Sequence, residues 1–184
     1  MKVVVLLSGG VDSTACLAYY RRQRRQYVSA LHVNYGQSAR VRELRAARAV
    51  SAHYGVRLRT IRVSATRALD GYIPARNALL LTLALMHFGS GSGLVSLGIH
   101  AGTRYADCTP DFVRAMQAVF DVYAQGTVVI DAPFVEWRKG DIWRYLQKRR
   151  APIRLTYSCE LGKRQPCGTC PSCHDIQILG ADAR

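Results

Sequence analysis

Short apolar runs and longer amphipathic stretches alternate along the chain. Four runs rich in apolar residues are too short for helices and predict buried strands at residues 3–5, 27–33, 94–99 and 127–130. Residues 56–63 instead alternate strictly between apolar and polar side chains, which is typical of a half-exposed strand. The pattern therefore predicts five strands, with the alternating one at an edge of the sheet and the 94–99 strand near its centre.

The stretches between these runs predict helices. In the stretch at about residues 39–54, the apolar side of the predicted helix carries Val41, Leu44, Ala47 and Val50. Glu43 and the neighbouring arginines lie on its other sides. Pro110 stands where proline is favoured, in the first turn of a helix. Five helices are predicted, at about residues 14–20, 39–54, 75–88, 110–124 and 139–149.

Strands that alternate with helices of this length form βαβ units, which predicts an α/β fold with a doubly wound, five-stranded parallel sheet. Residues 1–152 would form this domain, with residues 153–184 as a C-terminal segment packed on it. Right-handed crossovers place the carboxyl ends of the strands at one edge, where such sheets bind ligands. A site is therefore expected among the loops 8–13, 34–38, 64–77, 100–110 and 131–139.

The first of these loops contains two adjacent glycines, Gly9 and Gly10, before a helix that Asp12 and Ser13 open. Successive backbone N–H groups and the positive end of the helix dipole can then face one point, which is typical of a phosphate site. The loop lacks the Gly-Lys-Ser/Thr ending of the Walker loop. Residues 8–13 match the signature Ser-Gly-Gly-x-Asp-Ser and so resemble the PP-loop ATP pyrophosphatases. This resemblance implies a Rossmann-like fold of the HUP type and cleavage of ATP between its α and β phosphates.

Four of the six cysteines lie within the last 26 residues, spaced C-x7-C-x2-C-x2-C: Cys159, Cys167, Cys170 and Cys173. Such crowding in a protein of a reducing compartment favours a metal over disulfides. Four thiolates in a turn-rich tail are typical of tetrahedral Zn²⁺ in a closed, structural site. An iron–sulfur cluster is the alternative, although the usual cluster run places its fourth cysteine downstream. We expect zinc, fastening the tail to the domain.

The formal charge of +14 arises from 26 basic against 12 acidic residues. Basic residues cluster only at 21–25 and 148–150, both near predicted helix C-termini, where cations are favourable without any ligand. Aromatic and basic residues do not interleave as in RNA-binding modules, so a nucleic-acid partner is not favoured. Because no apolar run approaches a membrane span and the N-terminus shows no signal peptide, we expect a cytoplasmic protein without membrane association.

Six motifs together resemble the 7-cyano-7-deazaguanine synthase (QueC) family over nearly the whole chain. They are, in order, the loop 8–13, Asn34–Gln37, Ile73–Asn77, Asp107–Pro110, Lys139–Ile142 and Ser158–Cys173. The resemblance implies that ATP adenylates a 7-deazaguanine carboxylate and that ammonia captures the acyl group as an amide. A second adenylation then dehydrates the amide to the nitrile that queuosine synthesis uses. The family also implies a homodimer.

The resemblance implies the site residues as well. With Mg²⁺ offsetting the charge of the pyrophosphate, the ATP site would comprise Leu7, Ser8, Gly9, Gly10, Asp12, Ser13 and His32. The catalytic residues would be Asp12 and the two cations Arg76 and Lys139, which could stabilise charge on the α-phosphate. The alternative for either cation is a surface salt bridge. The deazapurine would contact Tyr35, Gln37, Asn77, Asp107 and Cys108.

The roles of four of these substrate residues are qualified by other interpretations. Asp107 is equally suited to capping the helix predicted at 110–124. Cys108 has no base beside it in the sequence, so we do not assign it as a nucleophile. The tyrosine and glutamine of the 34–37 motif could simply form a turn.

Two segments depart from the family pattern. Residues 64–73 replace a considerably longer segment, and residues 100–106 lack the family's acidic and Tyr-Pro pattern. Both lie on the substrate edge, where an opened pocket has room for an acceptor bulkier than ammonia. One alternative is therefore a relative that transfers the carboxylate to another amine, such as a protein in a modification or antiviral system. A second is a PP-loop enzyme that modifies tRNA, and the least favoured is an inactive scaffold stapled by zinc.

Overall fold

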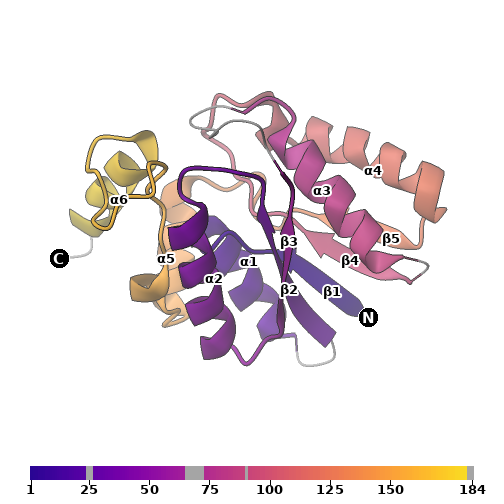
Figure 1. Ribbon diagram of the computed structural model, residues 1–184, viewed down its shortest axis with the longest axis horizontal. Coiled ribbons are helices and arrows are strands. Elements are labelled where there is room, and N and C mark those ends of the chain that lie inside the picture. Colours follow the sequence, from indigo (N-terminus) through magenta and orange to yellow (C-terminus); the bar gives the residue numbers. More distant parts are fainter. Residues whose placement is uncertain (24–26, 65–72, 90, 182–184) are drawn as a thin grey trace.

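The computed structural model describes residues 1–23, 27–64, 73–89 and 91–181. Within these ranges five strands form one entirely parallel sheet in the order β3-β2-β1-β4-β5 (Figure 1). The strands are β1 (Lys2–Leu6), β2 (Tyr27–Asn34), β3 (Leu58–Arg62), β4 (Gly93–Ser96) and β5 (Val128–Asp131). The predicted parallel sheet is confirmed, with β3 at an edge. The central strand, however, is β1, and β4 lies between it and β5.

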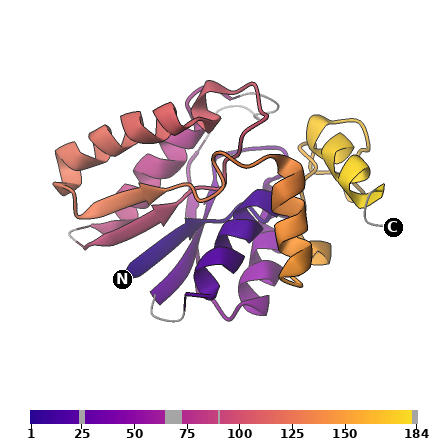
Figure 2. The same cartoon turned by 180° about the vertical axis from the view of Figure 1, so that it is seen from behind.

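Helices cover both faces of the sheet, as Figures 1 and 2 show. One face carries α1 (Val11–Arg21), α2 (Arg40–His53) and α5 (Lys139–Lys148), and the other carries α3 (Arg76–Phe88) and α4 (Pro110–Ala124). Successive side chains of β1 point to opposite faces. Val3 and Val5 therefore enter the core under α1 and α5, whereas Val4 enters the core under α3 and α4. The doubly wound architecture is confirmed.

The apolar side predicted for α2 is partly wrong. Val41 is 68% exposed, and the buried side of the helix is formed by Ala46, Ala47, Val50 and Ser51. Small residues form this side where α2 packs against the loop at Gly9. Val41 lies nine residues before Val50, which is about two and a half helical turns, so it faces away from the buried side.

The C-terminal segment contains a helix, α6 (Pro171–Ala181), that the turn-rich pattern of the tail did not predict. Pro171 occupies its first position, where the missing N–H costs nothing. Figure 1 shows the tail at one end of the molecule, beside α5. There Ile176 packs against the core under α1 and α5, and the side chain of Leu179 lies near Gly140.

Helix α4 is capped by Thr109 rather than by Asp107. The Thr109 side-chain oxygen accepts a hydrogen bond from the Phe112 backbone N–H at 3.2 Å. Asp107 lies earlier, in a short 3₁₀ turn over Ala106–Cys108, so its predicted capping role is wrong. A second 3₁₀ turn spans Ile153–Leu155. Among the described residues, no helix is both long and apolar enough to cross a membrane.

Replacing Phe120 by alanine is expected to destabilise the domain by about 3–5 kcal/mol, because Phe120 is completely buried in the core under α4. Denaturant unfolding at equilibrium measures this change. Tyr123→Ala is the matched control on the same helix: Tyr123 is 76% exposed, so its loss should change stability by no more than about 0.5 kcal/mol. Equal effects of the two variants would contradict the assigned packing of α4.

Candidate active site

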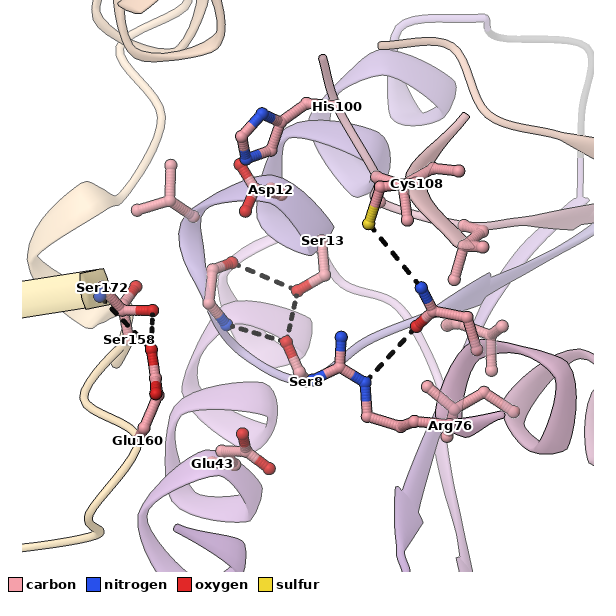
Figure 3. A pocket seen from close by; sticks show the side chains of 18 of the residues that line it. Ser8, Asp12, Ser13, Glu43, Arg76, His100, Cys108, Ser158, Glu160 and Ser172 are labelled. Carbon is pink, nitrogen blue, oxygen red and sulfur yellow. Dashed lines mark hydrogen bonds between the residues drawn. The ribbon is translucent and has the colours of Figure 1, made fainter. Parts of the chain in front are cut away.

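A cavity of about 660 Å³ opens at the carboxyl edge of the sheet, where the topology predicts ligand binding (Figure 3). Its wall combines the ends of β1 and β2 and the segment after β4 with the first turns of α1, α3 and α5. The C-terminal segment completes the wall through residues 157, 158, 160, 171, 172 and 175. The cavity is therefore built from segments spread over almost the whole chain.

The loop between β1 and α1 is held in shape by its own serines. The Ser8 and Ser13 hydroxyl oxygens lie 3.1 Å apart. The Gly10 N–H donates to Ser8 Oγ at 3.2 Å, and the Gly9 N–H donates to Ser13 Oγ at 3.3 Å. Because α1 begins at Val11, the free N–H groups of its first turn lie at this loop, the arrangement that favours phosphate.

Gly9 does not line the cavity but seats the loop on α2. Its φ of +89° lies in the region that favours glycine. A Cβ placed there would lie 2.6 Å from the Ala47 nitrogen and 2.9 Å from the Glu43 carbonyl oxygen. The loop and α2 are therefore in direct backbone contact, and the side facing away from α2 is left for a ligand.

An ion pair links the starts of α1 and α5 across the cavity. Lys139 Nζ lies 2.5 Å from Asp12 Oδ2. The other carboxylate oxygen, Asp12 Oδ1, is buried and has no hydrogen-bond partner among the described residues. The start of α5 is fixed by Asp141, whose carboxylate accepts from the Arg138 N–H at 3.0 Å. A cation and a partly unsatisfied carboxylate thus stand together beside the loop at residues 8–13, which we call the phosphate-type loop.

Arg76 and Asn77 open α3 on the opposite side of the cavity. Ala75 precedes them in the left-handed region, with φ of 60°. Arg76 Nε lies 3.4 Å from Asn77 Oδ1, and Asn77 Nδ2 donates to the Asp107 carbonyl at 3.0 Å. Asn77 Nδ2 also lies 3.9 Å from Cys108 Sγ. Burial raises the pKa of the Cys108 thiol, which keeps it in its neutral form.

The turn after β2 is organised by Gln37. Its Oε1 accepts from the Tyr35 N–H at 3.0 Å, and its Nε2 donates to Glu43 Oε2 at 2.6 Å and to the Val33 carbonyl at 3.3 Å. Burial raises the pKa of the Glu43 carboxyl, and it raises the pKa of Tyr35 to about 12. The turn after β2 and the first turn of α2 therefore present a neutral phenol and a desolvated carboxyl group to the cavity.

His32, on β2, is buried and neutral. Its Nδ1 lies 3.0 Å from the Leu7 carbonyl oxygen, which can only accept, so Nδ1 carries the proton. Burial lowers the pKa of His32, and the remaining nitrogen, Nε2, has no partner among the residues that the structure describes. An acceptor is thus left unsatisfied in the cavity wall.

The structure brings nearly all of the predicted site residues together. Twelve line the cavity: Leu7, Ser8, Gly10, Asp12, Ser13, His32, Tyr35, Gln37, Arg76, Asn77, Cys108 and Lys139. Gly9 and Asp107 do not line it. Asp107 contributes its backbone carbonyl to Asn77, and its carboxylate lies 3.9 Å from Cys108 Sγ.

Several cavity residues were not predicted from the sequence, among them Glu43, His100, Ser158, Glu160 and Asp175. For Glu43 a signal was present: residues 43, 46, 47 and 50 have the spacing of one helix side, and the last three are buried. The residues of the tail had no such signal, because only its cysteines showed a pattern.

The four tail cysteines form one cluster. The sulfur atoms of Cys159, Cys167, Cys170 and Cys173 all lie within 4.8 Å of one another. Those of Cys167 and Cys173 are 3.8 Å apart, close to the edge of a tetrahedron with metal–sulfur bonds of about 2.3 Å. Hydrogen bonds from Thr169 lower the pKa of Cys167 to about 6, whereas burial raises that of Cys173 to about 12. A metal cation would allow all four to be thiolates, so the residues fit such an ion.

The cysteine cluster is tied directly to the phosphate-type loop. The Tyr157 N–H donates to the Gly9 carbonyl at 2.9 Å, and Ser158 lines the cavity next to Cys159. Glu160 accepts from the Ser172 hydroxyl at 2.8 Å and from its N–H at 3.3 Å, which joins the loop after Cys159 to the start of α6. Figure 3 shows Ser158, Glu160 and Ser172 together on the side of the loop away from Arg76.

Comparison with solved structures supports the fold. The chain superposes on the U34-tRNA thiolase NcsA from Methanococcus maripaludis, solved with its [4Fe-4S] cluster, with a TM-score of 0.58 and 12% sequence identity. The match covers 98% of this chain but only 65% of the thiolase chain. At this identity the likeness shows a shared fold and nothing about the reaction or the metal.

Sequence comparison is more specific. A chain named 7-cyano-7-deazaguanine synthase from Desulfitobacterium hafniense is 36% identical over 201 residues, which covers 94% of this chain and 85% of that protein. One of the same name from Methanosphaerula palustris is 32% identical, covering 99% and 95% of the two chains. The first alignment is longer than the 184 residues of this chain, so the relative has residues without a counterpart here.

The family model described as queuosine biosynthesis protein QueC matches residues 2–71 and 65–177. The two matches meet in the segment predicted to be shorter than in the family, of which residues 65–72 lie outside the described residues. The phosphate-type loop, the Arg76–Asn77 pair and the cysteine cluster all fall within the matched segments. Over nearly its entire length, therefore, the chain belongs to the QueC family.

Proposed function

We propose that this chain is an ATP-dependent ligase that converts 7-carboxy-7-deazaguanine and ammonia into 7-cyano-7-deazaguanine. Two adenylations are required, the first leading to an amide and the second to the nitrile, and each releases AMP and pyrophosphate. The relatives that bear the name of this enzyme support the substrate. The observation that supports the reaction is the serine-braced loop, which faces a cavity with Arg76 and Lys139 at its sides.

The loop is proposed to hold the pyrophosphate half of ATP. The N–H groups of the first turn of α1 lie at the loop beside the Ser8 and Ser13 hydroxyls, and together these donors suit a phosphate group. Asp12 is the residue suited to Mg²⁺, since its buried Oδ1 lacks a partner among the described residues and carboxylate oxygen is a preferred ligand of that ion. Bound Mg²⁺ would offset phosphate charge, and Asp12 would then release Lys139 toward the phosphates.

Arg76 and Lys139 are proposed to stabilise the charge that develops at the α-phosphate when the substrate carboxylate attacks it. They approach from opposite walls, on α3 and α5, so that one cation can face each side of the phosphorus. Figure 3 shows the Arg76 guanidinium directed toward Ser8. The deazapurine is proposed to lie beyond Arg76, against Asn77 and Cys108, with Tyr35 and Gln37 at its edge.

Arg76→Ala is expected to lower the rate of adenylation by about 10²- to 10³-fold, because a positioned cation is lost at the reacting phosphate. Carboxylate-dependent exchange of labelled pyrophosphate into ATP measures this step without the later ones. Arg144→Ala is the control: this exposed arginine pairs with Asp141 on α5 and does not line the cavity, so its loss should leave the rate unchanged. A comparable decrease in both variants would argue against the role of Arg76.

The tail is proposed to hold structural Zn²⁺ and to form, as residues 153–184, a second unit on the ATP-binding domain of residues 1–152. All four thiols are engaged with one another, so no open coordination position is proposed. The ion would set the position of Ser158 and Glu160 in the cavity wall, and it is given no part in the chemistry.

Mass spectrometry of the complete reaction tests the function. Purified protein is incubated with Mg·ATP, 7-carboxy-7-deazaguanine and ammonium chloride, and AMP is measured in parallel. The nitrile with two AMP per nitrile is the expected result. AMP without amide or nitrile would show that ammonia is not the acceptor, and consumption of neither substrate would contradict the proposal.

A further inference from the structure

Glu43 is a carboxyl group in the cavity wall that the proposed roles leave unused. It lies in the first turn of α2, and its backbone carbonyl touches the phosphate-type loop at Gly9. Figure 3 shows its side chain beside the loop on the Ser8 side, with Cys108 on the other side of the loop. The carboxyl group therefore stands between the phosphate-type loop and Gln37, where the phosphate end of the cavity meets the edge of the proposed deazapurine pocket.

One oxygen of this carboxyl group is fixed and the other is available. Oε2 accepts from Gln37 Nε2 at 2.6 Å, and Gln37 is itself held by the Tyr35 N–H and the Val33 carbonyl. The hydrogen bonds of the described residues do not engage Glu43 Oε1, and no salt bridge in that part of the chain includes Glu43. The side chain is thus held in one orientation with an unused acceptor at the cavity.

A carboxylate at this place needs a cation. Phosphate oxygens held by the loop would put negative charge near Glu43, and like charges in a desolvated site repel strongly. Mg²⁺ fits poorly here because it requires a nearly complete octahedron of oxygen ligands, and the atom next to the carboxylate is the Gln37 amide nitrogen, a donor. An ammonium ion needs only acceptors.

A second acceptor in the same wall supports ammonium. His32 is 1% exposed and lines the cavity, and its Nε2 is an unprotonated acceptor without a partner among the described residues. Glu43 Oε1 and His32 Nε2 therefore offer acceptors from α2 and β2. Arg76 is near enough for its positive charge to act on Glu43, but no salt bridge joins the two in the described part of the chain, and the proposed function assigns Arg76 to the α-phosphate. The proposed reaction consumes ammonia, and its protonated form, ammonium, is a cation that donates hydrogen bonds to such acceptors.

We propose that Glu43 binds the ammonium ion and removes its proton, so that ammonia is released beside the acyl adenylate. This inference rests on the proposed function. The proton passes from nitrogen to the Glu43 carboxylate, and the freed lone pair forms the new bond to the acyl carbon. The bond from that carbon to the phosphate oxygen breaks with its electrons, so that AMP leaves. The nitrogen then loses one more proton, and two protons reach solvent for each amide formed.

Glu43→Gln tests the proposal, because glutamine keeps an acceptor for Gln37 but cannot take a proton. Three quantities are measured in the complete chain: carboxylate-dependent pyrophosphate exchange, amide formation from ammonium, and hydroxamate formation from hydroxylamine. Hydroxylamine is largely unprotonated at neutral pH and needs no base to release its lone pair. We expect exchange and hydroxamate formation to stay near the wild-type rates, while amide formation falls by about 10²-fold.

Two further variants sharpen the test. Glu136→Gln removes an exposed carboxylate that does not line the cavity, and it should change none of the three quantities. Glu43→Asp keeps a base one methylene farther away, and it should restore part of the ammonium-dependent rate with a higher KM for ammonium.

The outcomes separate the alternatives. An equal loss of amide and hydroxamate formation, a raised KM for the deazapurine, or an unchanged rate with ammonium would each overturn the role of Glu43. Absence of carboxylate-dependent exchange in the wild-type chain would instead overturn the proposed function, and this inference with it.

Folding of the variant is checked by thermal unfolding. Burial raises the pKa of Glu43, so the folded chain holds this proton more tightly than the unfolded chain does. Stability is therefore lost as pH rises through the raised pKa, and a neutral glutamine avoids that loss. We expect Glu43→Gln to unfold at or above the wild-type midpoint at neutral pH. A purely structural carboxylate would give the opposite shift.

Discussion

Gly9→Ala is expected to lower ATP-dependent turnover by about 10³-fold, because the loop that faces the phosphates would lose its shape. The added Cβ would lie 2.6 Å from the Ala47 nitrogen and 2.8 Å from the Ala46 side chain. Neither contact is the end of a flexible chain, so the loop must move away from α2. The hydrogen bonds from the Gly9 N–H to the Ser13 hydroxyl and from the Gly10 N–H to the Ser8 hydroxyl would then be lost.

The same substitution should also destabilise the fold. A non-glycine residue at φ of +89° costs about 1–2 kcal/mol, and the overpacking adds about 1–3 kcal/mol. Gly55→Ala is the matched control: its φ is +60°, and a Cβ there meets no atom within 4 Å. The free energy of unfolding of Gly55→Ala should fall by only about 1 kcal/mol, and this variant should keep full activity. Turnover and denaturant unfolding measure both effects, and similar turnover in the two variants would contradict the assigned role of the loop.

Cys170→Ser is expected to remove the metal and, with it, one wall of the cavity. Structural zinc sites of four ligands bind with about 10–16 kcal/mol in small domains, so the loss of one ligand is enough to unfold the segment around it. Tyr157 would then no longer donate to Gly9, and Ser158 and Glu160 would leave the cavity. Turnover should fall by about 10²-fold or more.

Metal analysis and hydrogen exchange distinguish loss of the metal with local unfolding of the tail from unfolding of the whole chain. Elemental analysis should find one zinc per wild-type chain and none in the variant, and amides of residues 157–175 should lose protection while those of β1 keep it. Cys16→Ala removes a buried cysteine outside the cluster and should keep both the metal and the protection. Iron in the wild-type chain would favour a cluster of iron and sulfide, and retained protection in Cys170→Ser would show that the tail folds without metal.

The sheet and the phosphate-type loop were predictable because both depend on local patterns. Apolar runs such as Val3–Val5 are typical of buried parallel strands. Because strands and helices alternate along the chain, right-handed crossovers place the carboxyl ends of the strands, and the loops that follow them, at one edge of the sheet. The cysteine cluster was predictable because the ligand spacing alone limits the chemistry.

Packing between distant segments was less predictable. Helix spacing places Glu43 on the same side of α2 as Ala46, Ala47 and Val50, but a charged residue is not expected there, and Val41 was assigned to that side although it is exposed. Thr109 is the cap because α4 begins at Pro110, whereas Asp107 lies two residues before the cap position, within the 3₁₀ turn. The helix α6 and the cavity residues of the tail depend on where the cysteines anchor the chain, which the sequence does not encode locally.

The contact between Tyr157 and Gly9 has a consequence for the order of synthesis. The loop at residues 8–13 leaves the ribosome well before the part of the tail that forms the wall beside it, at residues 157–175. The sheet can form earlier, since all of its strands precede residue 132. A nascent or truncated chain can therefore be folded in its sheet and still lack a complete nucleotide site. On the proposed function, metal capture by the tail, which is synthesised after the sheet, would complete the cavity wall of a chain that is already folded.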